Sequence, residues 1–81
     1  MEKNSLSRLA GWMHGECTGE LEIPAVSTDS RAAGGALFLP LVGERFDAHD
    51  FIPQAVGNGA LAVVSHRRGE RYPVPAIYVE D

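Results

Sequence analysis

The amino-acid sequence predicts one small α/β domain, and three observations carry that prediction. The chain has 81 residues, so it can build one core but not several domains. Hydrophobic residues make up 44% of the sequence and charged residues 22%, which is typical of a folded protein. A strand, a polar loop, a helix and a second strand follow one another over residues 36–65, the order of a right-handed βαβ crossover.

The first predicted element is an amphipathic helix. Asn4 or Ser5 can cap it, and apolar residues recur at helical spacing from Leu6 to Met13. We expect Gly15 to end it, because glycine tolerates the left-handed conformation that follows many helices. A helix this short must pack against the rest of the domain to persist.

Extended segments follow this helix. Residues 21–23 and 25–28 are predicted to be short strands. After a turn at 33–35, residues 36–42 form a continuous apolar run, which fits a strand that is covered on both faces. Residues 43–50 are expected to form a polar loop.

The second half of the chain continues with a helix and two strands. Asp50 can cap a helix that runs from Phe51 to about Val56, and the glycines that follow it can end it. Residues 61–65 and 76–79 are the last two predicted strands, joined by a charged connection. Because the chain stops directly after a predicted strand, we expect it to be part of a longer protein.

Composition and charge exclude several classes of protein. The net charge of −4 and the pI near 5.2 argue against a dedicated nucleic-acid-binding protein. A single cysteine, Cys17, excludes an internal disulfide framework and suits a reducing compartment. The longest apolar stretch is far shorter than the roughly 20 residues of a membrane-spanning helix. We therefore expect a soluble, cytoplasmic protein.

The sequence holds no recognisable catalytic or metal-binding motif. It lacks both a G-x-x-x-x-G-K-[ST] phosphate-binding loop and an H-E-x-x-H zinc motif. Surface or structural roles are expected for the three scattered histidines, His14, His49 and His66. A solvated loop is expected for the interrupted basic cluster of Arg67, Arg68 and Arg71.

Two polar segments follow predicted strands, and each has two interpretations. In residues 27–31, S-T-D-S-R, the side chains can hold a turn, or the hydroxyls and backbone donors can face phosphate or carbonyl oxygens of a ligand. In residues 43–50, the aromatic Phe46 can plug the core while Asp47 or Asp50 caps the helix. Alternatively, the glycine lets this loop approach a ligand closely and the ring covers a base. Ligands of α/β sheets bind in crevices at the carboxyl ends of strands.

Several strings in the chain together resemble a known family. S-T-D-S-R at 27–31, G-x-L-F-L at 35–39, G-E-R-F-D-A-H-D-F at 43–51 and A-V-x-x-G-A at 55–60 are similar to the N-terminal domain of the Mur ligases. The resemblance runs from the first helix to Val79. The string at 43–51 favours the MurF branch over the neighbouring MurE branch, whereas D-S-R is shared by both.

The resemblance implies a small three-layer α/β domain with a mixed β-sheet, spanning residues 1–81. In the family this domain binds the UDP end of UDP-N-acetylmuramoyl-peptide, and central and C-terminal domains in cis bind ATP with Mg²⁺ and recruit the incoming amino component. The complete MurF-type ligase adds D-alanyl-D-alanine to UDP-N-acetylmuramoyl-tripeptide in cytoplasmic peptidoglycan precursor synthesis. This chain alone would carry no catalytic residue, metal or cofactor, and no nucleic-acid or membrane partner is implied.

Carried over residue by residue, the resemblance places the UDP site on the two polar segments. Contacts to uridine and pyrophosphate would fall on Thr28, Ser30, Gly43, Glu44, Arg45 and Phe46. Supporting roles would fall on Asp29, Arg31 and Asp47.

Three other interpretations stay open from the sequence. The chain could be the corresponding domain of a MurE-type ligase, or a stand-alone interaction module with no nucleotide ligand. A complete small enzyme is the least favoured, because no nucleophile, base and orienting group can be brought together from the sequence.

Overall fold

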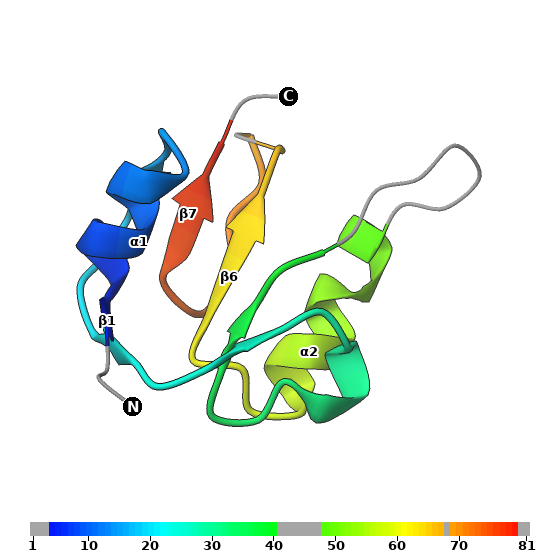
Figure 1. Ribbon diagram of the computed structural model, residues 1–81. Helices are drawn as coiled ribbons and strands as arrows, with labels where there is room; N and C mark the ends of the chain where they lie inside the picture. Colours follow the sequence, from blue (N-terminus) through cyan, green and yellow to red (C-terminus); the bar gives the residue numbers. More distant parts are fainter. Residues whose placement is uncertain (1–3, 41–47, 68, 80–81) are drawn as a thin grey trace.

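A five-stranded mixed sheet forms the centre of the computed structural model, which describes residues 4–40, 48–67 and 69–79. The strand order is β2-β7-β6-β5-β4. The strands are β2 (Glu16–Cys17), β4 (Val26–Ser27), β5 (Leu37–Phe38), β6 (Ala62–Ser65) and β7 (Ala76–Tyr78). Strands β4 to β7 run parallel, and β2 pairs antiparallel with β7. A separate antiparallel pair joins β1 (Asn4–Ser5) to β3 (Glu22–Ile23) (Figure 1).

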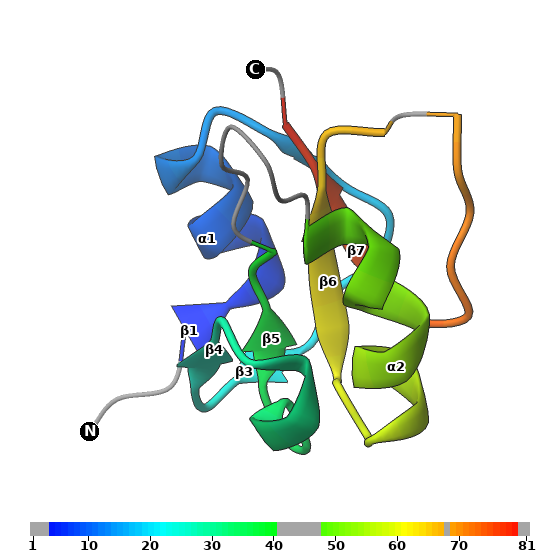
Figure 2. The ribbon, with the colours of Figure 1, turned by 90° about the vertical axis from the view of Figure 1, so that its right-hand side faces the viewer.

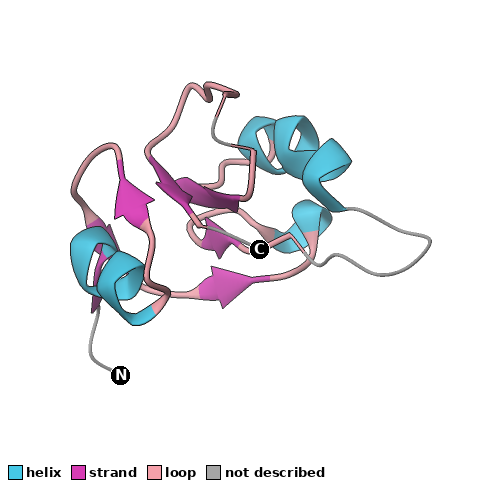
Figure 3. Ribbon diagram, turned by 90° about the horizontal axis from the view of Figure 1, so that it is seen from above, coloured by secondary structure: helices cyan, strands magenta, loops and turns pink. Residues whose placement is uncertain are grey.

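Helices cover both faces of this sheet. Helix α1 (Leu6–Trp12) lies on one face, and α2 (Ile52–Gly57) lies on the other, as Figure 2 and Figure 3 show from two sides. The 3₁₀ turn η1 (Ser30–Ala32) packs beside α2. The observed architecture is therefore the α/β domain that the sequence pattern predicts, with the three layers and mixed sheet that the family resemblance implies.

Each face of the sheet has its own apolar core. The α1-side cluster contains Leu6, Leu9, Ala10, Ile23, Leu37, Ala62, Val64, Ile77 and Val79. The α2-side cluster contains Ala33, Phe38, Ile52, Ala55, Ala60, Val63 and Ala76. Successive residues of a strand point to opposite faces, so the neighbours Leu37 and Phe38 fall in different clusters. This explains why the predicted strands are apolar throughout instead of alternating.

The start of α1 is capped as the sequence predicts. Ser5 Oγ accepts a hydrogen bond from the backbone N–H of Arg8 at 3.2 Å. The Glu20 carboxylate accepts from the backbone N–H of Ser7 at 3.1 Å and from the Ser7 hydroxyl. These two bonds from Ser7 lower the pKa of Glu20. Donors that the first turn cannot satisfy internally thus find side-chain acceptors.

The end of α1 differs from the prediction for Gly15. The left-handed residue is His14, with a φ of 54°. Gly15 instead packs against β7, and a Cβ atom on it would lie 2.7 Å from the Tyr78 carbonyl oxygen and 2.7 Å from Val79 Cγ1. The glycine is therefore required by a close approach of two backbones, and the prediction of a left-handed Gly15 is wrong.

The start of α2 also differs from the prediction. A 3₁₀ turn, η2 (Ala48–Phe51), precedes the helix, and Phe51 takes the N-cap position with no side-chain hydrogen bond. Asp50 does not cap α2, because the extra turn moves it out of that position. Its Oδ1 accepts from Arg67 Nη2 at 3.2 Å instead. Gly59, with a φ of +94°, follows the end of the helix as expected.

The predicted βαβ unit is present, with a shorter first strand than expected. β5 and β6 are parallel neighbours, and α2 lies between them in the chain. Of the predicted strand 36–42, only Leu37–Phe38 pairs as β5, and residues 41 and 42 lie outside the described residues. Within the described part of the chain, no helix has the length and apolar character needed to cross a membrane.

Candidate functional site

The ends of the parallel strands bring polar residues to one edge of the sheet. Thr28 directly follows β4, and His66 and Arg67 directly follow β6. Of the predicted site residues, the structure describes Thr28, Asp29, Ser30 and Arg31. The others lie outside the described residues, namely Gly43, Glu44, Arg45, Phe46 and Asp47.

The segment after β4 forms a turn that its own side chains hold. Ser27 Oγ accepts from the Asp29 N–H at 3.2 Å and donates to the Asp29 carbonyl oxygen at 3.1 Å. Asp29 Oδ1 accepts from the Arg31 N–H at 2.9 Å and from Arg31 Nε at 3.4 Å. The Arg31 backbone N–H is the main cause of the lowered pKa of the Asp29 carboxyl. Asp29 is therefore a charged acceptor that begins η1.

The two hydroxyls predicted to contact a ligand have different surroundings. Thr28 is exposed, and its hydroxyl makes no hydrogen bond with another described residue. Ser30 is half-buried and turns toward α2, where its Oγ lies 2.8 Å from Gln54 Oε1. The structure thus leaves the Thr28 hydroxyl open to solvent and holds the Ser30 hydroxyl against a helix.

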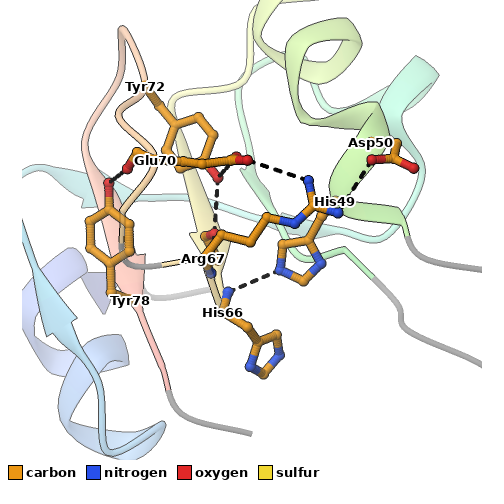
Figure 4. A network of polar contacts seen from close by, with 8 residues as sticks. His49, Asp50, His66, Arg67, Glu70, Tyr72 and Tyr78 are labelled. Atoms are coloured by element: carbon orange, nitrogen blue, oxygen red, sulfur yellow. Dashed lines mark hydrogen bonds and ion pairs between the residues drawn. The ribbon is translucent and has the colours of Figure 1, made fainter.

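A second polar group surrounds Arg67 at the end of β6 (Figure 4). The Arg67 guanidinium lies 3.2 Å from Asp50 Oδ1 and 3.6 Å from Glu70 Oε1. Glu70 Oε2 accepts from the Tyr72 hydroxyl at 2.9 Å, and the Tyr72 and Ser65 hydroxyls are 2.9 Å apart. Burial raises the pKa of Tyr72 above its usual value. Arg67 is therefore already compensated by two carboxylates, while Glu70 and Arg71 of the same connection are exposed to solvent.

His49 is a buried hydrogen-bond acceptor in the same region. Its side chain is 3% exposed, and its Nε2 accepts from the backbone N–H of His66 at 2.9 Å. The two imidazole rings lie with their centroids 5.2 Å apart. To accept this bond, Nε2 must be unprotonated, so His49 fixes the end of β6 as a neutral ring. This is the structural role that the sequence favours for a scattered histidine.

Removing that acceptor should destabilise the fold. His49→Leu keeps much of the side-chain volume but leaves the His66 N–H without this partner, and we expect a loss of about 2 kcal/mol in the free energy of unfolding. His49→Gln, which offers an amide oxygen at similar reach, should lose less. Urea denaturation of the two variants checks this, and a His49→Leu variant as stable as the parent would contradict the structural role of the hydrogen bond.

Sequence reasoning missed the partners that organise both polar groups. Gln54, Ser65 and Tyr72 carry no motif, and they reach their partners only through the tertiary fold. The one sequence feature that could have indicated the second polar group was Ser65, a lone serine at the end of the apolar run 61–65. In the described ranges, no group of three or more His, Cys, Asp or Glu side chains could hold a metal ion.

Comparison with known proteins identifies the family. A family model described as the Mur ligase family, catalytic domain, matches residues 22–79. The chain belongs to the Mur ligase family. The UDP-N-acetylmuramoyl-tripeptide–D-alanyl-D-alanine ligases of Haemophilus influenzae and Escherichia coli are 36% and 42% identical to it, over 100% and 95% of the chain. A UDP-N-acetylmuramoyl-L-alanyl-D-glutamate–2,6-diaminopimelate ligase of Listeria monocytogenes is 34% identical over the whole chain.

A solved Mur ligase structure has the same fold. The ligase of Acinetobacter baumannii that joins D-alanyl-D-alanine superposes on the whole chain with a TM-score of 0.88 and 34% sequence identity. The chain spans 19% of that structure, and 18% and 17% of the Haemophilus and Escherichia relatives. The resemblance inferred from the strings at 27–31, 35–39, 43–51 and 55–60 is thereby confirmed at the level of the Mur ligase family and its α/β fold.

Proposed function

We propose that this chain is the N-terminal domain of a MurF-type ligase and anchors the UDP end of UDP-N-acetylmuramoyl-tripeptide. The observation that carries the proposal is the match over the whole chain to ligases that join D-alanyl-D-alanine to that class of substrate. The string at 43–51 favours the same branch. The Listeria relative, named for 2,6-diaminopimelate, makes the MurE-type domain the second candidate.

The proposed UDP site combines the turn after β4 with the loop at 43–47. Thr28 offers an exposed hydroxyl, and Asp29 with Arg31 holds the turn on which Thr28 and Ser30 lie. The remaining proposed contacts are those of the predicted loop, with Asp47 supporting Gly43, Glu44, Arg45 and Phe46. The two segments must converge in space for this site to exist.

Local groups must supply the attraction for the diphosphate, because the chain as a whole has a net charge of −4. Arg67 is neutralised by Asp50 and Glu70, which makes it a poor phosphate ligand. Arg31 has a side chain that is 79% exposed and, among the residues that the structure describes, pairs only with the carboxylate of Asp29 in its own turn. We therefore propose that backbone N–H groups of the two segments and the side chain of Arg45 bind the diphosphate, with Arg31 nearby.

In the complete protein, this anchoring would serve a distant reaction. Central and C-terminal domains in cis would bind ATP and Mg²⁺ and recruit D-alanyl-D-alanine, in the cytoplasmic synthesis of the peptidoglycan precursor. Binding energy from the nucleotide would help to hold the remote carboxylate in line for reaction. The chain itself would make and break no bond.

Nucleotide binding by the purified 81-residue chain tests this proposal. UDP and UDP-N-acetylmuramic acid should bind without ATP or Mg²⁺, with a dissociation constant near 1 mM, roughly −4 kcal/mol. Uridine should bind no better than UDP, because donors of the loop are proposed to meet the diphosphate. ADP, which carries the same charge, is the matched control. Binding of ADP as tight as that of UDP would contradict a uridine-specific site and favour the interaction module.

The same preparation should show no ligase chemistry. Because the sequence has no phosphate-binding loop, we expect neither ATP hydrolysis nor ligation of D-alanyl-D-alanine. Turnover above that of a mock preparation would overturn the interpretation of the chain as one part of a longer ligase.

A further inference from the structure

A groove lies between α2 and the last part of the connection from β6 to β7, which runs beside this helix in orange in Figure 2. Its volume is about 420 Å³, within the range of roughly 300–1,000 Å³ that is typical of sites for small molecules. Helix α2 contributes the apolar residues Ile52, Pro53 and Val56, and the connection contributes Tyr72 and Pro73. We call this feature the α2 groove.

The wall formed by the connection is held in place by its own contacts. The Tyr72 hydroxyl lies 2.9 Å from the Ser65 hydroxyl and donates to Glu70 Oε2 at 2.9 Å. The Tyr78 hydroxyl donates to the Glu70 carbonyl oxygen at 2.6 Å, and the Tyr72 and Tyr78 rings stack with their centroids 6.3 Å apart. A ligand would therefore meet a preformed wall, which lowers the entropy that binding costs.

The charges at the α2 groove are not equally available to a ligand. Glu70 and Arg71 also line the groove. The Glu70 carboxylate already accepts from Tyr72 and lies 3.6 Å from the guanidinium of Arg67. Arg71 is exposed and makes no hydrogen bond or ion pair with another described residue. The available charge is thus a guanidinium, whose donors match the two oxygens of a carboxylate.

We propose that the α2 groove is a binding site for a small aromatic carboxylate. The ring of the ligand lies against Tyr72 and the two prolines, and its carboxylate pairs with Arg71. Aromatic rings gain from contact with one another beyond the area that they bury. The prolines lose almost no side-chain entropy when a ligand covers them. This site shares no residue with the proposed UDP site, so it is an addition to the proposed function.

Three ligands of the same ring system test the chemistry of the site. Naphthylacetate should bind the 81-residue chain with a dissociation constant of about 1 mM, as expected for a ligand of this size. Its uncharged amide should bind about 3- to 5-fold more weakly, the size of one exposed ion pair, and naphthylethylamine more weakly still. Amide shifts should centre on residues 52–57 and 70–72. Equal binding of the three ligands, or shifts centred on α1, would overturn the proposal.

Two variants with matched controls test the assigned residues. In Arg71→Gln, the preference for naphthylacetate over its amide should fall below about 1.5-fold. Arg8→Gln removes an exposed arginine from α1, on the other face of the sheet, and should keep the parent preference. An Arg71→Gln variant with the parent preference would overturn the pairing of the carboxylate with Arg71.

The wall of the α2 groove is tested at an exposed position, where a substitution leaves no core cavity. Pro53→Ala should weaken naphthylacetate and its amide alike, by about 2- to 3-fold, because the ligand loses apolar contact area. Pro24→Ala, which changes an exposed proline outside the groove, should leave both affinities unchanged. Parent affinities in Pro53→Ala would overturn the placement of the ring.

Competition with UDP separates this inference from the proposed function. UDP should not displace naphthylacetate, since the two sites have no residue in common. Naphthylacetate binding in the groove without any binding of UDP would support this inference and contradict the proposed function. Displacement by UDP would place both ligands in one site and overturn the α2 groove as a separate one.

Discussion

Replacing Phe38 with alanine is expected to remove a large part of the stability of the domain. Phe38 is 1% exposed and packs in the α2-side cluster with Ile52, Ala55 and Val63. Truncation of a buried phenylalanine costs about 3–5 kcal/mol, through lost apolar burial and the cavity left behind. A domain of this size has a total stability of only about 4–12 kcal/mol. The variant should therefore be partly or fully unfolded at 37 °C.

Urea denaturation followed by far-UV circular dichroism measures this loss. The matched control is Trp12→Ala, because Trp12 is a larger aromatic side chain that is 64% exposed on α1. We expect the control to cost less than about 1 kcal/mol. A Phe38→Ala variant within about 1 kcal/mol of the parent would mean that α2 does not pack on the sheet as described.

A single methyl group at Gly15 is expected to destabilise the domain by about 1–3 kcal/mol. The added Cβ would lie 2.7 Å from the Tyr78 carbonyl oxygen and 2.9 Å from Ile77 Cγ2. One of these atoms belongs to the backbone of β7, so the chain after α1 cannot accept the methyl group without moving the strand. The pairing of β2 with β7 should loosen as a result.

Gly11→Ala is the matched control for this substitution. Gly11 lies inside α1, and a Cβ atom on it would meet nothing within 4 Å. Because alanine is the better helix former, this variant should gain about 0.5–1 kcal/mol. The two melting temperatures should therefore move in opposite directions. A Gly15→Ala variant that melts at or above the parent would contradict the close approach of the two backbones.

The layered fold was predictable because both faces of the sheet are buried. Residues 36–42 and 61–65 are apolar without alternation, and this is the pattern of a parallel strand between two layers of helix. The apolar spacing from Leu6 to Met13 predicted the helix that covers one of those faces. Each of these apolar patterns extends over several neighbouring residues. Tertiary contacts therefore did not change the type of element that each pattern predicts.

Single-residue signals were less reliable, because one residue type serves several physical purposes. A glycine after a helix suits either a left-handed φ or a close backbone approach, and Gly15 serves the second. An aspartate before a helix can cap it, but here the extra 3₁₀ turn η2 places Asp50 away from the N-cap position. Its carboxylate accepts a hydrogen bond from Arg67 instead. The choice depends on neighbours that are distant in sequence.

The candidate site was predictable only in part, for the same reason. The hydroxyls and the carboxylate of residues 27–31 predicted a turn held by its own side chains, and the structure has that turn. The hydrogen bonds between Ser30 and the side chains of Gln54 and Asn58 join residues that are 24 and 28 positions apart in the sequence. No rule of sequence spacing predicts such pairs. The direction of the Ser30 hydroxyl, toward Gln54, therefore could be learned only from the structure.

Amide chemical-shift mapping of the 81-residue chain with UDP tests the nucleotide-anchoring role most directly. The largest shifts should fall in two stretches, Thr28 to Arg31 and Gly43 to Asp47, and should saturate together as one site. Ligand near 10 mM, about tenfold above the expected dissociation constant, should bring the site close to saturation. Shifts centred on Arg67 to Arg71, or no shifts at that concentration, would contradict a UDP site built on the turn after β4.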